Sequence, residues 1–397
     1  MITKYALSVE PVNRKVTFRL YPTLRQAECL EHVFTLHQRL YNVALECKEL
    51  TALRKECEEY RELNAQSCQV TLKRLDLAFR HFFRRVKQGD AKAGFPRFKA
   101  RDRFSGFGFK THGDGFRIES PGKHGYVRLS GIGMIRMRGK ARSYGEVCTA
   151  EVLRKQSRWY LSVTVKCQPR RQSGTSGIGI DWGLETFATL AVSDGSYKKV
   201  ENPRHLRKSL QKLRKAQRDV TRKKRGSKNR QKAIRVVQRV HQRVAQQRKD
   251  HLHQTSHAII SQAALVATEE LSVKNMTAKG GSYKKGLNRE ILSTSPGMFF
   301  SFLKYKAEEA GIFWKEIPTR EVKPSQTCSN CGRQEKKALS QRTHPCSCGL
   351  VLGRDENAAR VILNWALTQD ASGWEPSRCG EGALVPSLKQ ETHAISA

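Results

Sequence analysis

The sequence is poor in acidic residues and contains no long apolar segment. Its 397 residues include 36 Asp and Glu against 74 Lys and Arg. No stretch approaches the roughly 18 consecutive apolar residues that a membrane-spanning helix needs, and the start, MITKYALSVEP, lacks the apolar core of a signal peptide. The sequence therefore predicts a soluble protein that stays inside the cell, in the cytoplasm.

A disulfide framework is also absent. The 11 cysteines are odd in number and spread over a long chain, and four of them fall between residues 328 and 348. This distribution favours a reducing compartment and one metal site. The other seven have no metal-ligand spacing and are interpreted as ordinary residues: Cys29, Cys47, Cys57, Cys68, Cys148, Cys167 and Cys379.

Basic residues are the most prominent feature of the composition. The formal net charge is +38. A surface this basic repels itself unless a polyanion is bound, so nucleic acid is the expected partner, and an anionic membrane surface is the competing one. The length suggests two to three domains, and 38% apolar residues are enough to build their cores.

The first part of the chain mixes strand and helix patterns. Alternation over residues 15–21 predicts a strand, and the residues after Pro22 predict a helix. Helical patterning continues to about Lys87, which indicates a small helical bundle. The apolar face of the first helix is expected to contain Cys29, Val33, Leu36, Leu40 and Val43. The apolar positions of the later helical segment are Leu72, Leu75, Leu77, Phe79, Phe82 and Phe83.

The amino-acid composition changes near Gly94. Residues 94–110 combine Gly, Pro, Phe and basic residues, which predicts a loop-rich, basic and aromatic surface. Residues 115–167 carry short β-like runs separated by Gly-containing turns, as in a small barrel, and can form one split β domain with the strand at 15–21. The Gly- and Ser-rich residues 170–177 predict a domain boundary.

Residues 204–250 contain 19 Lys or Arg and two acids, Asp219 and Asp250. Two apolar seams at helical spacing predict two basic helices in a hairpin, interrupted at 226–229. A solvated face or a disordered tail is the alternative interpretation of such a run. The hairpin tip is the expected site of phosphate contacts, through Arg222, Lys223, Lys224, Arg225, Lys228 and Arg230.

Three separated acids form a candidate catalytic set. Asp181 ends a short apolar strand, Glu269 and Glu270 end another, and Asp355 begins a helix. This is the order of acids in RNase H-like nucleases, where carboxylates hold two magnesium ions that activate water and stabilise the leaving oxygen. Each acid alone is weak evidence, since such residues are usually turn or N-cap residues, and the strand pattern does not choose between Glu269 and Glu270.

Four cysteines have the spacing of a zinc ribbon. Cys328 and Cys331 form a CxxC pair, and Cys346 and Cys348 form a CxC pair. Four thiolates suit tetrahedral zinc with no open position, which indicates one structural zinc ion. A redox pair or four unrelated cysteines is the alternative.

Several motifs together resemble the TnpB family of transposon-associated nucleases, which are similar to the ancestors of type V CRISPR effectors. They occur in the family's order: FRLYPTLRQ, YNVALE, GFPRFK, GIDWGL, EELSVKNM, YKAEEAGIFWKEI, KPSQTCSNCG and CSCG followed by RDENAARVIL. The likeness covers roughly residues 15–370. It assigns the catalytic roles to Asp181, Glu269 and Asp355, with Glu270 as the variable neighbour of Glu269.

The resemblance also implies an α/β multidomain architecture. The expected domains are a β-barrel (wedge) domain of residues 1–21 and 96–170, a helical recognition lobe of 22–95, an RNase H-like (RuvC-type) nuclease domain of 174–326 and 351–372, an inserted zinc ribbon of 327–350, and a weakly ordered tail of 373–397.

The implied activity is RNA-guided DNA cleavage in a prokaryotic cell, with nucleoid association when the protein is bound to DNA. One protein per guide RNA is expected, and target DNA is recognised beside a short duplex motif. A guided DNA-binding regulator without cleavage and a strand-transferring transposase are the alternatives. The presence of all three acids argues against the first, and the zinc ribbon and basic barrel segment disfavour the second.

Overall fold

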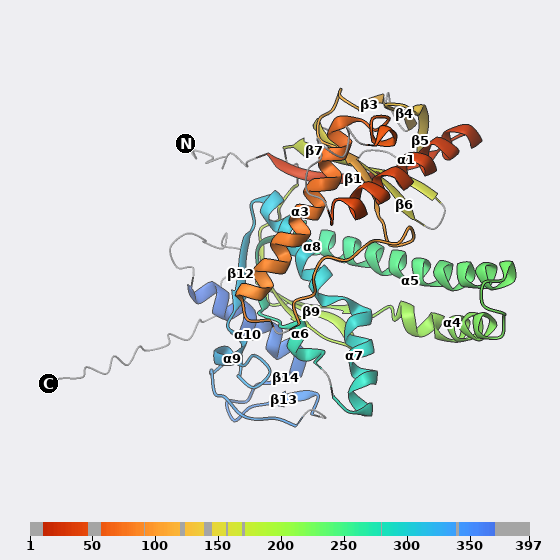
Figure 1. Cartoon of the computed structure of the whole chain (residues 1–397). Coiled ribbons are helices and arrows are strands. Elements are labelled where there is room, and N and C mark those ends of the chain that lie inside the picture. Colours follow the sequence, from red (N-terminus) through yellow and green to blue (C-terminus); the bar gives the residue numbers. More distant parts are fainter. Residues whose placement is uncertain are drawn as a thin grey trace, which may run out of the picture. The chain divides into compact units, whose positions relative to one another are not determined.

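The computed structural model describes residues 11–46, 57–90, 92–119, 124–138, 145–155, 158–168, 171–278, 280–338 and 341–369 (Figure 1). These residues form two compact units, one before and one after residue 168. The tail expected at residues 373–397, together with Cys47 and Cys379, lies outside the described residues.

The first unit is built on a seven-stranded antiparallel sheet with the order β2-β6-β7-β1-β5-β4-β3. β2 and β3 stand at opposite ends of this order, yet the rings of Phe109 and Phe116 on these strands lie 5.7 Å apart between centroids. The sheet is therefore nearly closed around its core. Its strands are β1 (Val12–Tyr21), β2 (Gly106–Phe109), β3 (Phe116–Glu119), β4 (His124–Leu129), β5 (Gly133–Arg138), β6 (Glu146–Lys155) and β7 (Arg158–Cys167).

The expectation of a loop at residues 94–110 is wrong at its C-terminal end, because β2 is a fully buried strand. Its glycines permit close pairing and do not mark a turn. A Cβ on Gly106 would lie 1.9 Å from the carbonyl oxygen of Val152 on β6. A small residue inside a strand often marks such a close approach of two backbones.

Helices α1 (Leu24–Val43) and α3 (Ala65–Lys87), with the short η1 (Glu58–Tyr60), complete this unit. Thr23 begins α1 with a capping box. On the expected apolar face, Leu36 and Leu40 are fully buried and pack toward η1 and α3. A second face, with Leu30 and Phe34, is also fully buried against the sheet, so α1 is covered on two sides.

The second unit has a five-stranded sheet with the order β10-β9-β8-β11-β12. The β8–β9 and β9–β10 pairs are antiparallel, whereas the β8–β11 and β11–β12 pairs are parallel. Helices α5 (Lys228–Ile260) and α8 (Pro296–Ala310) cover one face and α10 (Arg354–Gln369) covers the other, which gives three layers. The strands are β8 (Ser176–Trp182), β9 (Thr186–Val192), β10 (Tyr197–Glu201), β11 (Ala263–Glu269) and β12 (Phe313–Ile317).

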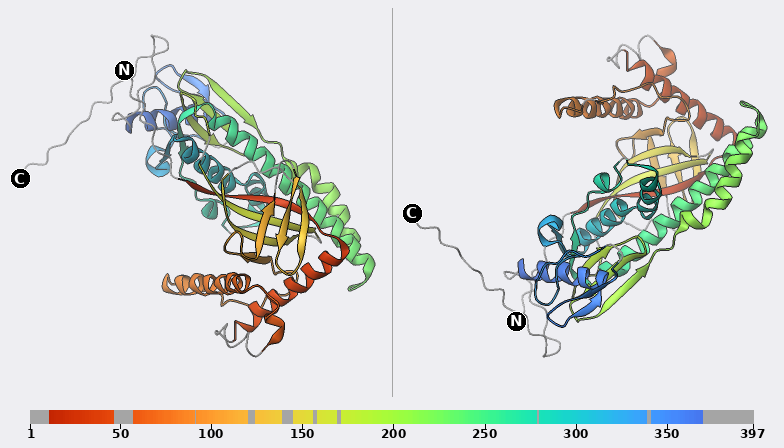
Figure 2. Two further views of the ribbon diagram at one scale, coloured as in Figure 1. Left: turned by 90° about the horizontal axis from the view of Figure 1, so that it is seen from above. Right: turned by 90° about the horizontal axis from the view of Figure 1, so that it is seen from below.

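The basic hairpin is confirmed as two packed helices, α4 (His205–Thr221) and α5 (Lys228–Ile260). They run side by side and project from the sheet of their own unit (Figures 1 and 2). α5 continues beyond the expected end at residue 250 and reaches the sheet core through Leu252, Ile259 and Ile260. The remaining elements are α6 (Val273–Met276), α7 (Ser282–Thr294), α8 (Pro296–Ala310), α9 (Thr319–Val322), β13 (Thr343–Pro345), β14 (Val351–Gly353) and α10 (Arg354–Gln369).

No helix in the described part of the chain is both long enough and apolar enough to cross a lipid bilayer.

Candidate functional site

Asp181 is on the face of β8 that α10 covers. Side chains alternate along a strand, so Asp181 shares its face with Gly179. Gly179 faces α10, because a Cβ there would lie 2.3 Å from the carbonyl oxygen of Ala359. Ile178 and Ile180 point the other way, into the core under α5 and α8. The alternating residues of GIGID thus place the two isoleucines on the core face of β8 and the glycine and aspartate on the face toward α10.

Glu269 reaches the same face from the neighbouring parallel strand β11. Ala267 is directly opposite Gly179 in the register and packs in the core cluster that includes α10. Glu269, two residues later, therefore lies level with Asp181 at the carboxyl end of both strands. Glu270 is exposed, and its backbone N–H donates to the carbonyl oxygen of Ile317 at 3.2 Å. The structure therefore separates the two glutamates that the strand pattern left open.

Asp355 joins this pair through the close packing of α10 on β8. It lies one helical turn before Ala359, the residue whose carbonyl oxygen faces Gly179. The hydrogen side chain of Gly179 lets the α10 backbone approach the strand, which brings the first turn of the helix to Asp181. The expected inward positions Ala358, Ile362 and Ala366 are buried, and Trp365 is half-buried.

The three acids repel one another electrostatically. Burial raises the pKa of Asp181 well above its usual value, and the carboxylates of Glu269 and Asp355 raise it further. The Arg354 guanidinium acts in the opposite sense. Burial also raises the pKa of Glu269. Among the described residues, none of the three carboxyl groups forms an ion pair or a side-chain hydrogen bond. Bound cations would balance this negative charge, and oxygen ligands of this kind suit magnesium.

Positive side chains flank the acids. Lys199 on β10 forms an ion pair with Glu356 at 2.8 Å, and Glu356 also accepts a hydrogen bond from the backbone N–H of Gly353. Arg354 donates to the carbonyl oxygens of Ala338 and Gln341. These contacts anchor the start of α10 beside the acidic cluster.

The four predicted cysteines converge. The Sγ atoms of Cys328 and Cys348 lie 3.7 Å apart, and those of Cys331 and Cys346 lie 3.6 Å apart. Tetrahedral zinc with Zn–S bonds of about 2.3 Å requires S···S distances of about 3.8 Å. These two distances are close to that value and all four Sγ atoms lie within 4.8 Å of one another, so the cluster is compatible with one zinc ion. The backbone N–H of Leu350 lowers the pKa of Cys348 to about 6, whereas burial raises the pKa of Cys328. A bound zinc ion would stabilise the thiolate form at both positions.

The cysteine cluster is the one group of three or more metal ligands, among the residues described, whose ligand atoms all lie within 4.8 Å of one another. The three acids do not form so tight a group. Within the described ranges, none of the other cysteines is in a disulfide bond: Cys29, Cys57, Cys68, Cys148 and Cys167.

Two asparagines tie the first cysteine knuckle to α10. The fully buried Asn357 accepts a hydrogen bond from the Ser329 backbone N–H at 2.9 Å and donates one to the Thr327 carbonyl oxygen at 2.7 Å. Asn364 donates to the Ser329 carbonyl oxygen at 3.0 Å. Because Asn357 is two residues after Asp355, the ribbon backbone and the third acid belong to one bonded unit.

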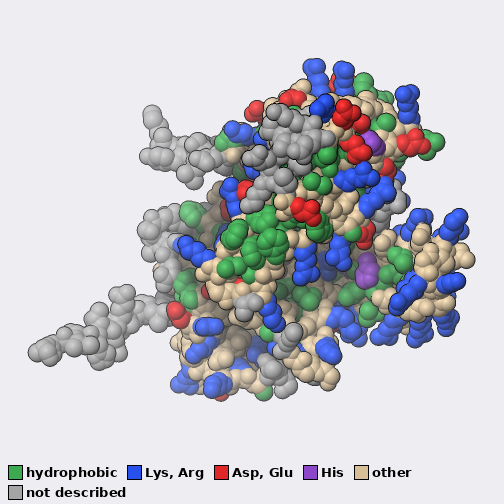
Figure 3. All heavy atoms as spheres, viewed as in Figure 1, with side chains coloured by type: hydrophobic (Ala, Val, Ile, Leu, Met, Phe, Trp, Pro, Cys, Tyr) green, Lys and Arg blue, Asp and Glu red, His purple; other side chains and the backbone are tan. Residues whose placement is uncertain are grey.

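The predicted phosphate-contact residues surround the α4–α5 turn. Arg222, Lys224, Arg225 and Lys228 are exposed, and Lys223 is half-buried. Arg230 differs, because its guanidinium donates to the Lys223 carbonyl oxygen at 3.2 Å and so holds the turn. Figure 3 shows Lys and Arg side chains crowded over this hairpin.

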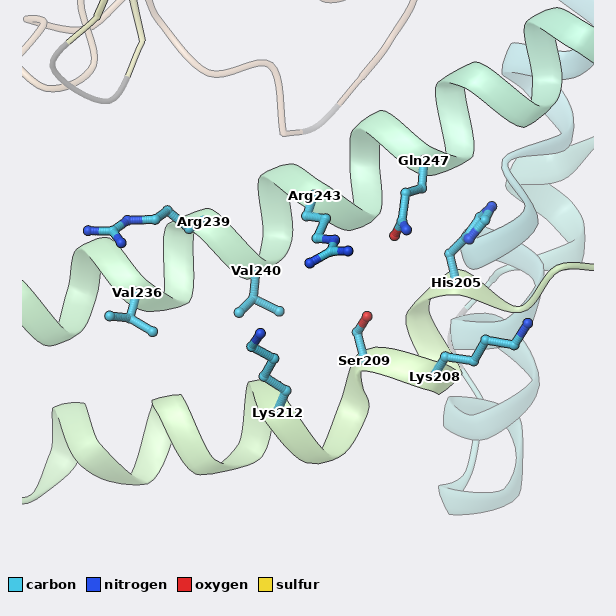
Figure 4. Close-up of a pocket in the computed structure, with 9 residues that line it drawn as sticks. All are labelled: His205, Lys208, Ser209, Lys212, Val236, Arg239, Val240, Arg243 and Gln247. Carbon is cyan, nitrogen blue, oxygen red and sulfur yellow. The ribbon is translucent and has the colours of Figure 1, made fainter.

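A cavity of about 370 Å³ lies between α4 and α5 nearer the sheet. In Figure 4, Ser209 and Lys212 of α4 and Arg243 and Gln247 of α5 point into this space. Burial lowers the pKa of His205 at its end, and the positive charge of Lys208 lowers it further. No acid is among its lining residues, which are His205, Lys208, Ser209, Lys212, Val236, Arg239, Val240, Arg243 and Gln247. An anionic group is the ligand that this lining favours.

Gly179 and Asn357 are positioning residues that the sequence interpretation did not single out. The signal for Gly179 was present, since GIGID places it at the strand spacing from the acid. Nothing in the sequence alone distinguished Asn357 from an ordinary polar residue in the first turn of a helix.

Two family models match successive parts of the chain, both mainly in the second unit. Residues 160–279, which include Asp181 and Glu269, match the OrfB_IS605 family, described as "Probable transposase". Residues 297–362 match the TNB domain of Cas12f1-like proteins. This second match includes the four clustered cysteines and Asp355.

Two curated relatives match most of the chain, and a third matches about half of it. A Streptomyces pristinaespiralis protein described as a candidate RNA-guided DNA endonuclease is 31% identical over 94% of this chain and 92% of its own. InsQ of Escherichia coli strain K12, described in the same way, is 31% identical over 82% of this chain and 79% of its own. TnpB-like protein L79 of Acanthamoeba polyphaga mimivirus is 26% identical over 48% of this chain and 37% of its own.

Among solved structures, the chain is similar in fold to the protein in a cryo-EM structure of the Cas12f1–sgRNA–target DNA complex. The TM-score is 0.58 at 13% sequence identity, and the match covers 89% of this chain and 99% of that one.

Proposed function

Because this chain belongs to the TnpB-like family of RNA-guided DNA endonucleases, we propose that it cuts DNA at sites selected by a bound guide RNA. The observation that carries the cutting activity is the convergence of Asp181, Glu269 and Asp355 on one face of the sheet. Sequence selection then resides in base pairing between guide and target, while the protein holds the backbone and reads a short adjacent duplex motif.

The second unit is proposed to be an RNase H-like, RuvC-type nuclease domain with the zinc ribbon inserted before α10. Its support is the mixed five-stranded sheet, whose central strand β8 carries the first acid and whose parallel neighbour β11 carries the second. In the first unit, the nearly closed sheet is proposed as the wedge domain, with 22–95 as the recognition lobe.

The three carboxylates would hold two magnesium ions, which supply an activated water and stabilise the leaving oxygen of the phosphodiester. The chain itself contributes placement. Gly179 sets the approach of α10, and Asn357 fixes its first turn against the ribbon. Arg354 and Lys199 lie beside the acids, where they can attract a phosphate group. Glu270 takes no part, since it is exposed beyond the strand.

Guide RNA and target DNA together explain the charge better than one duplex does. We assign phosphate contacts to the hairpin tip, through Arg222, Lys223, Lys224, Arg225, Lys228 and Arg230. The acid-free cavity between α4 and α5 extends this basic surface toward the sheet. We expect one protein per RNA, acting in the cytoplasm of a prokaryotic cell and associated with the nucleoid when bound to DNA.

The test compares four alanine variants in a plasmid-cleavage assay with purified protein, guide RNA and magnesium. Asp181→Ala, Glu269→Ala and Asp355→Ala should each abolish cutting and retain guide and target binding, because each leaves metal ions underligated. Glu270→Ala is the matched control and should cut normally. Normal cutting by Glu269→Ala would remove that residue from the site.

The same assay decides between cutting and the two alternatives. Binding of the target without cleavage by the wild type would indicate a guided regulator. Joined DNA products would indicate strand transfer, the activity to which the "Probable transposase" description of the matched family refers. Sequencing the RNA that co-purifies with the protein should reveal a defined scaffold ending in a variable guide.

A further inference from the structure

The last turns of α3 expose an apolar surface that the sequence placed in a helical bundle. The buried residues of α3 end at Leu75. Beyond it, Leu77 is 43%, Phe83 61% and Val86 51% exposed. The expectation that Leu77 and Phe83 pack in a bundle is therefore wrong within the first unit, because its described residues do not bury these side chains.

Aromatic rings gather on this surface. Phe79 and Phe82 of α3 each contact Phe95 of the following loop, with centroid separations of 5.3 and 5.4 Å. Phe83 contacts Phe82 at 5.2 Å and Phe79 at 6.4 Å. Phe95 is 57% exposed. We name these four rings the aromatic platform. Figure 3 shows hydrophobic side chains gathered over the same helix. Contiguous exposed apolar patches are often binding surfaces.

A hydrogen-bonded clasp holds the platform in place. Arg85 donates to the carbonyl oxygen of Gly94 at 3.1 Å and to that of His81 at 3.4 Å. The loop that carries Phe95 is thereby fastened to the helix that carries the other rings. A platform organised in advance loses little conformational entropy when a ligand binds.

Basic residues lie close to the rings in the sequence. Lys87, Lys92 and Arg97 are exposed, and within the described ranges none of them forms an ion pair. The two nearby acids are already engaged. Asp76 pairs with Arg80 at 3.0 Å, and Asp90 accepts the backbone N–H of Lys92 at 3.0 Å. The ligand of this surface must therefore combine flat apolar groups with negative charge.

We propose that the aromatic platform stacks against unpaired bases of a single-stranded nucleic acid, while Lys87, Lys92 and Arg97 contact its phosphates. Aromatic rings beside a basic track are the general means by which proteins hold single strands without reading their sequence. The proposal rests on the proposed function, which supplies RNA and unwound DNA as partners, and it adds a base-contacting site separate from the phosphate contacts of the hairpin.

The experiment measures binding of full-length protein to a labelled oligouridylate and to a labelled oligothymidylate over a range of salt concentrations. Replacing both Phe83 and Phe95 with Leu removes the flat π-faces but keeps apolar bulk, and both rings are exposed enough for the fold to tolerate the change. Affinity should fall roughly tenfold or more, while the slope of log affinity against log salt stays unchanged because no phosphate contact is lost. The two oligonucleotides distinguish an RNA-binding platform from a DNA-binding one.

Three comparisons complete the design. Replacing both rings with Tyr should preserve binding, and Phe313→Leu, which removes a 49% exposed ring in the second unit, should have no effect. An oligonucleotide lacking bases should weaken binding of the wild type but not of the Leu pair. Wild-type affinity in the Leu pair, or equal sensitivity of both proteins to base removal, would overturn the proposal in favour of an ordinary apolar docking face.

The outcomes also separate this inference from the proposed function. A Leu pair that binds like the wild type, in a protein that still cuts guided targets, rejects the platform alone. A wild-type protein that binds no single strand and cuts no DNA rejects both.

Discussion

At the residue scale, Gly179 allows α10 to pack closely on β8 because it has no Cβ atom. Replacing it with Ala places a Cβ 2.3 Å from the Ala359 carbonyl oxygen. We expect Gly179→Ala to lower the free energy of unfolding by about 1–3 kcal/mol, as overpacking does, and to reduce cleavage more than target binding. Thermal melting and a cleavage assay measure the two effects.

Gly286→Ala in α7 is the control for this substitution, because nothing lies within 4 Å of a Cβ there. It should leave stability unchanged or slightly higher, since Ala favours a helix. Equal behaviour of the two variants would show that α10 is not held at the distance described.

Lys306 provides a second residue-scale prediction, this time of pH dependence. Its Nζ is buried and donates to the His253 carbonyl oxygen at 2.7 Å and to Ser256 Oγ at 2.6 Å. Burial, with help from Arg171, lowers its pKa to about 8. The unfolded chain therefore binds more protons than the folded one between about pH 8 and pH 10.5, and this residue's contribution makes stability rise with pH across that window.

Lys306→Met removes the titration and keeps similar bulk. Relative to this variant, the wild type should gain on the order of 2 kcal/mol between about pH 8 and pH 10.5. Thermal melts of both proteins across this range measure the difference. Parallel curves would mean that the lysine titrates normally.

Sequence patterns identified functional residues where the residues next to them in the sequence form a recognisable local motif. The cysteine spacing and the strand and helix positions of Asp181 and Asp355 are local signals. The strand pattern could not choose Glu269 over Glu270, because that choice depends on the register between β11 and β8, strands more than 80 residues apart. Only the family resemblance chose it in advance.

At the scale of elements, the α4–α5 hairpin offers a test of phosphate binding. Replacing Arg222, Lys224, Arg225 and Lys228 with Gln should lower the slope of log affinity against log salt by about 0.7–0.9 for each lost contact. Sequence preference should not change, because phosphate contacts position a complex without specifying bases. Binding titrations with guide RNA and target DNA at several salt concentrations give the slopes.

Arg230 is kept in this variant because it holds the turn through Lys223. An unchanged melting temperature then shows that the hairpin remains folded. Unchanged affinities and slopes would make the hairpin tip a solvated face and move the main phosphate contacts to the first unit.

The ribbon gives a further prediction at this scale. Freshly purified protein should contain about one zinc per chain, and Cys331→Ser should lose zinc and destabilise the ribbon, because metal binding supplies its folding free energy. Cys148→Ser, outside the cluster, is the control. Elemental analysis together with proteolysis of the ribbon measures both effects, and zinc-free wild-type protein would contradict the assignment.

Local patterns predicted whole elements well where apolar periodicity was strong. The strands around Asp181 and in β11, the basic helices and α10 all formed as expected. Two elements, β2 and the C-terminal end of α3, differed from expectation. In both cases the sequence pattern did not show whether another part of the chain packs against the element. The glycines of β2 suggested a loop, but they pair closely with β6. The apolar end of α3 suggested a buried position, but the described residues of the first unit do not bury it.

At the scale of the whole molecule, charge and fold have different causes. The cores of both units are ordinary apolar clusters, so the net charge of +38 contributes nothing to folding and must repel itself in the free protein. Its value is in binding, where each phosphate contact releases counterions. In the basic hairpin, we expect the positive side chains to contact the phosphates of the nucleic-acid backbone. Near the aromatic platform, we expect them to contact phosphates next to the bases that stack on the rings.

The paired hydrogen bonds between Asn357 and the first cysteine knuckle have a consequence for the cell that carries this protein. They connect the four-cysteine cluster to the helix that begins with the third acid. We therefore expect zinc starvation to leave a protein that still finds its target but no longer breaks it. The supply of zinc would then limit how often the protein cuts DNA, although the expected role of the cysteine cluster is structural and not catalytic.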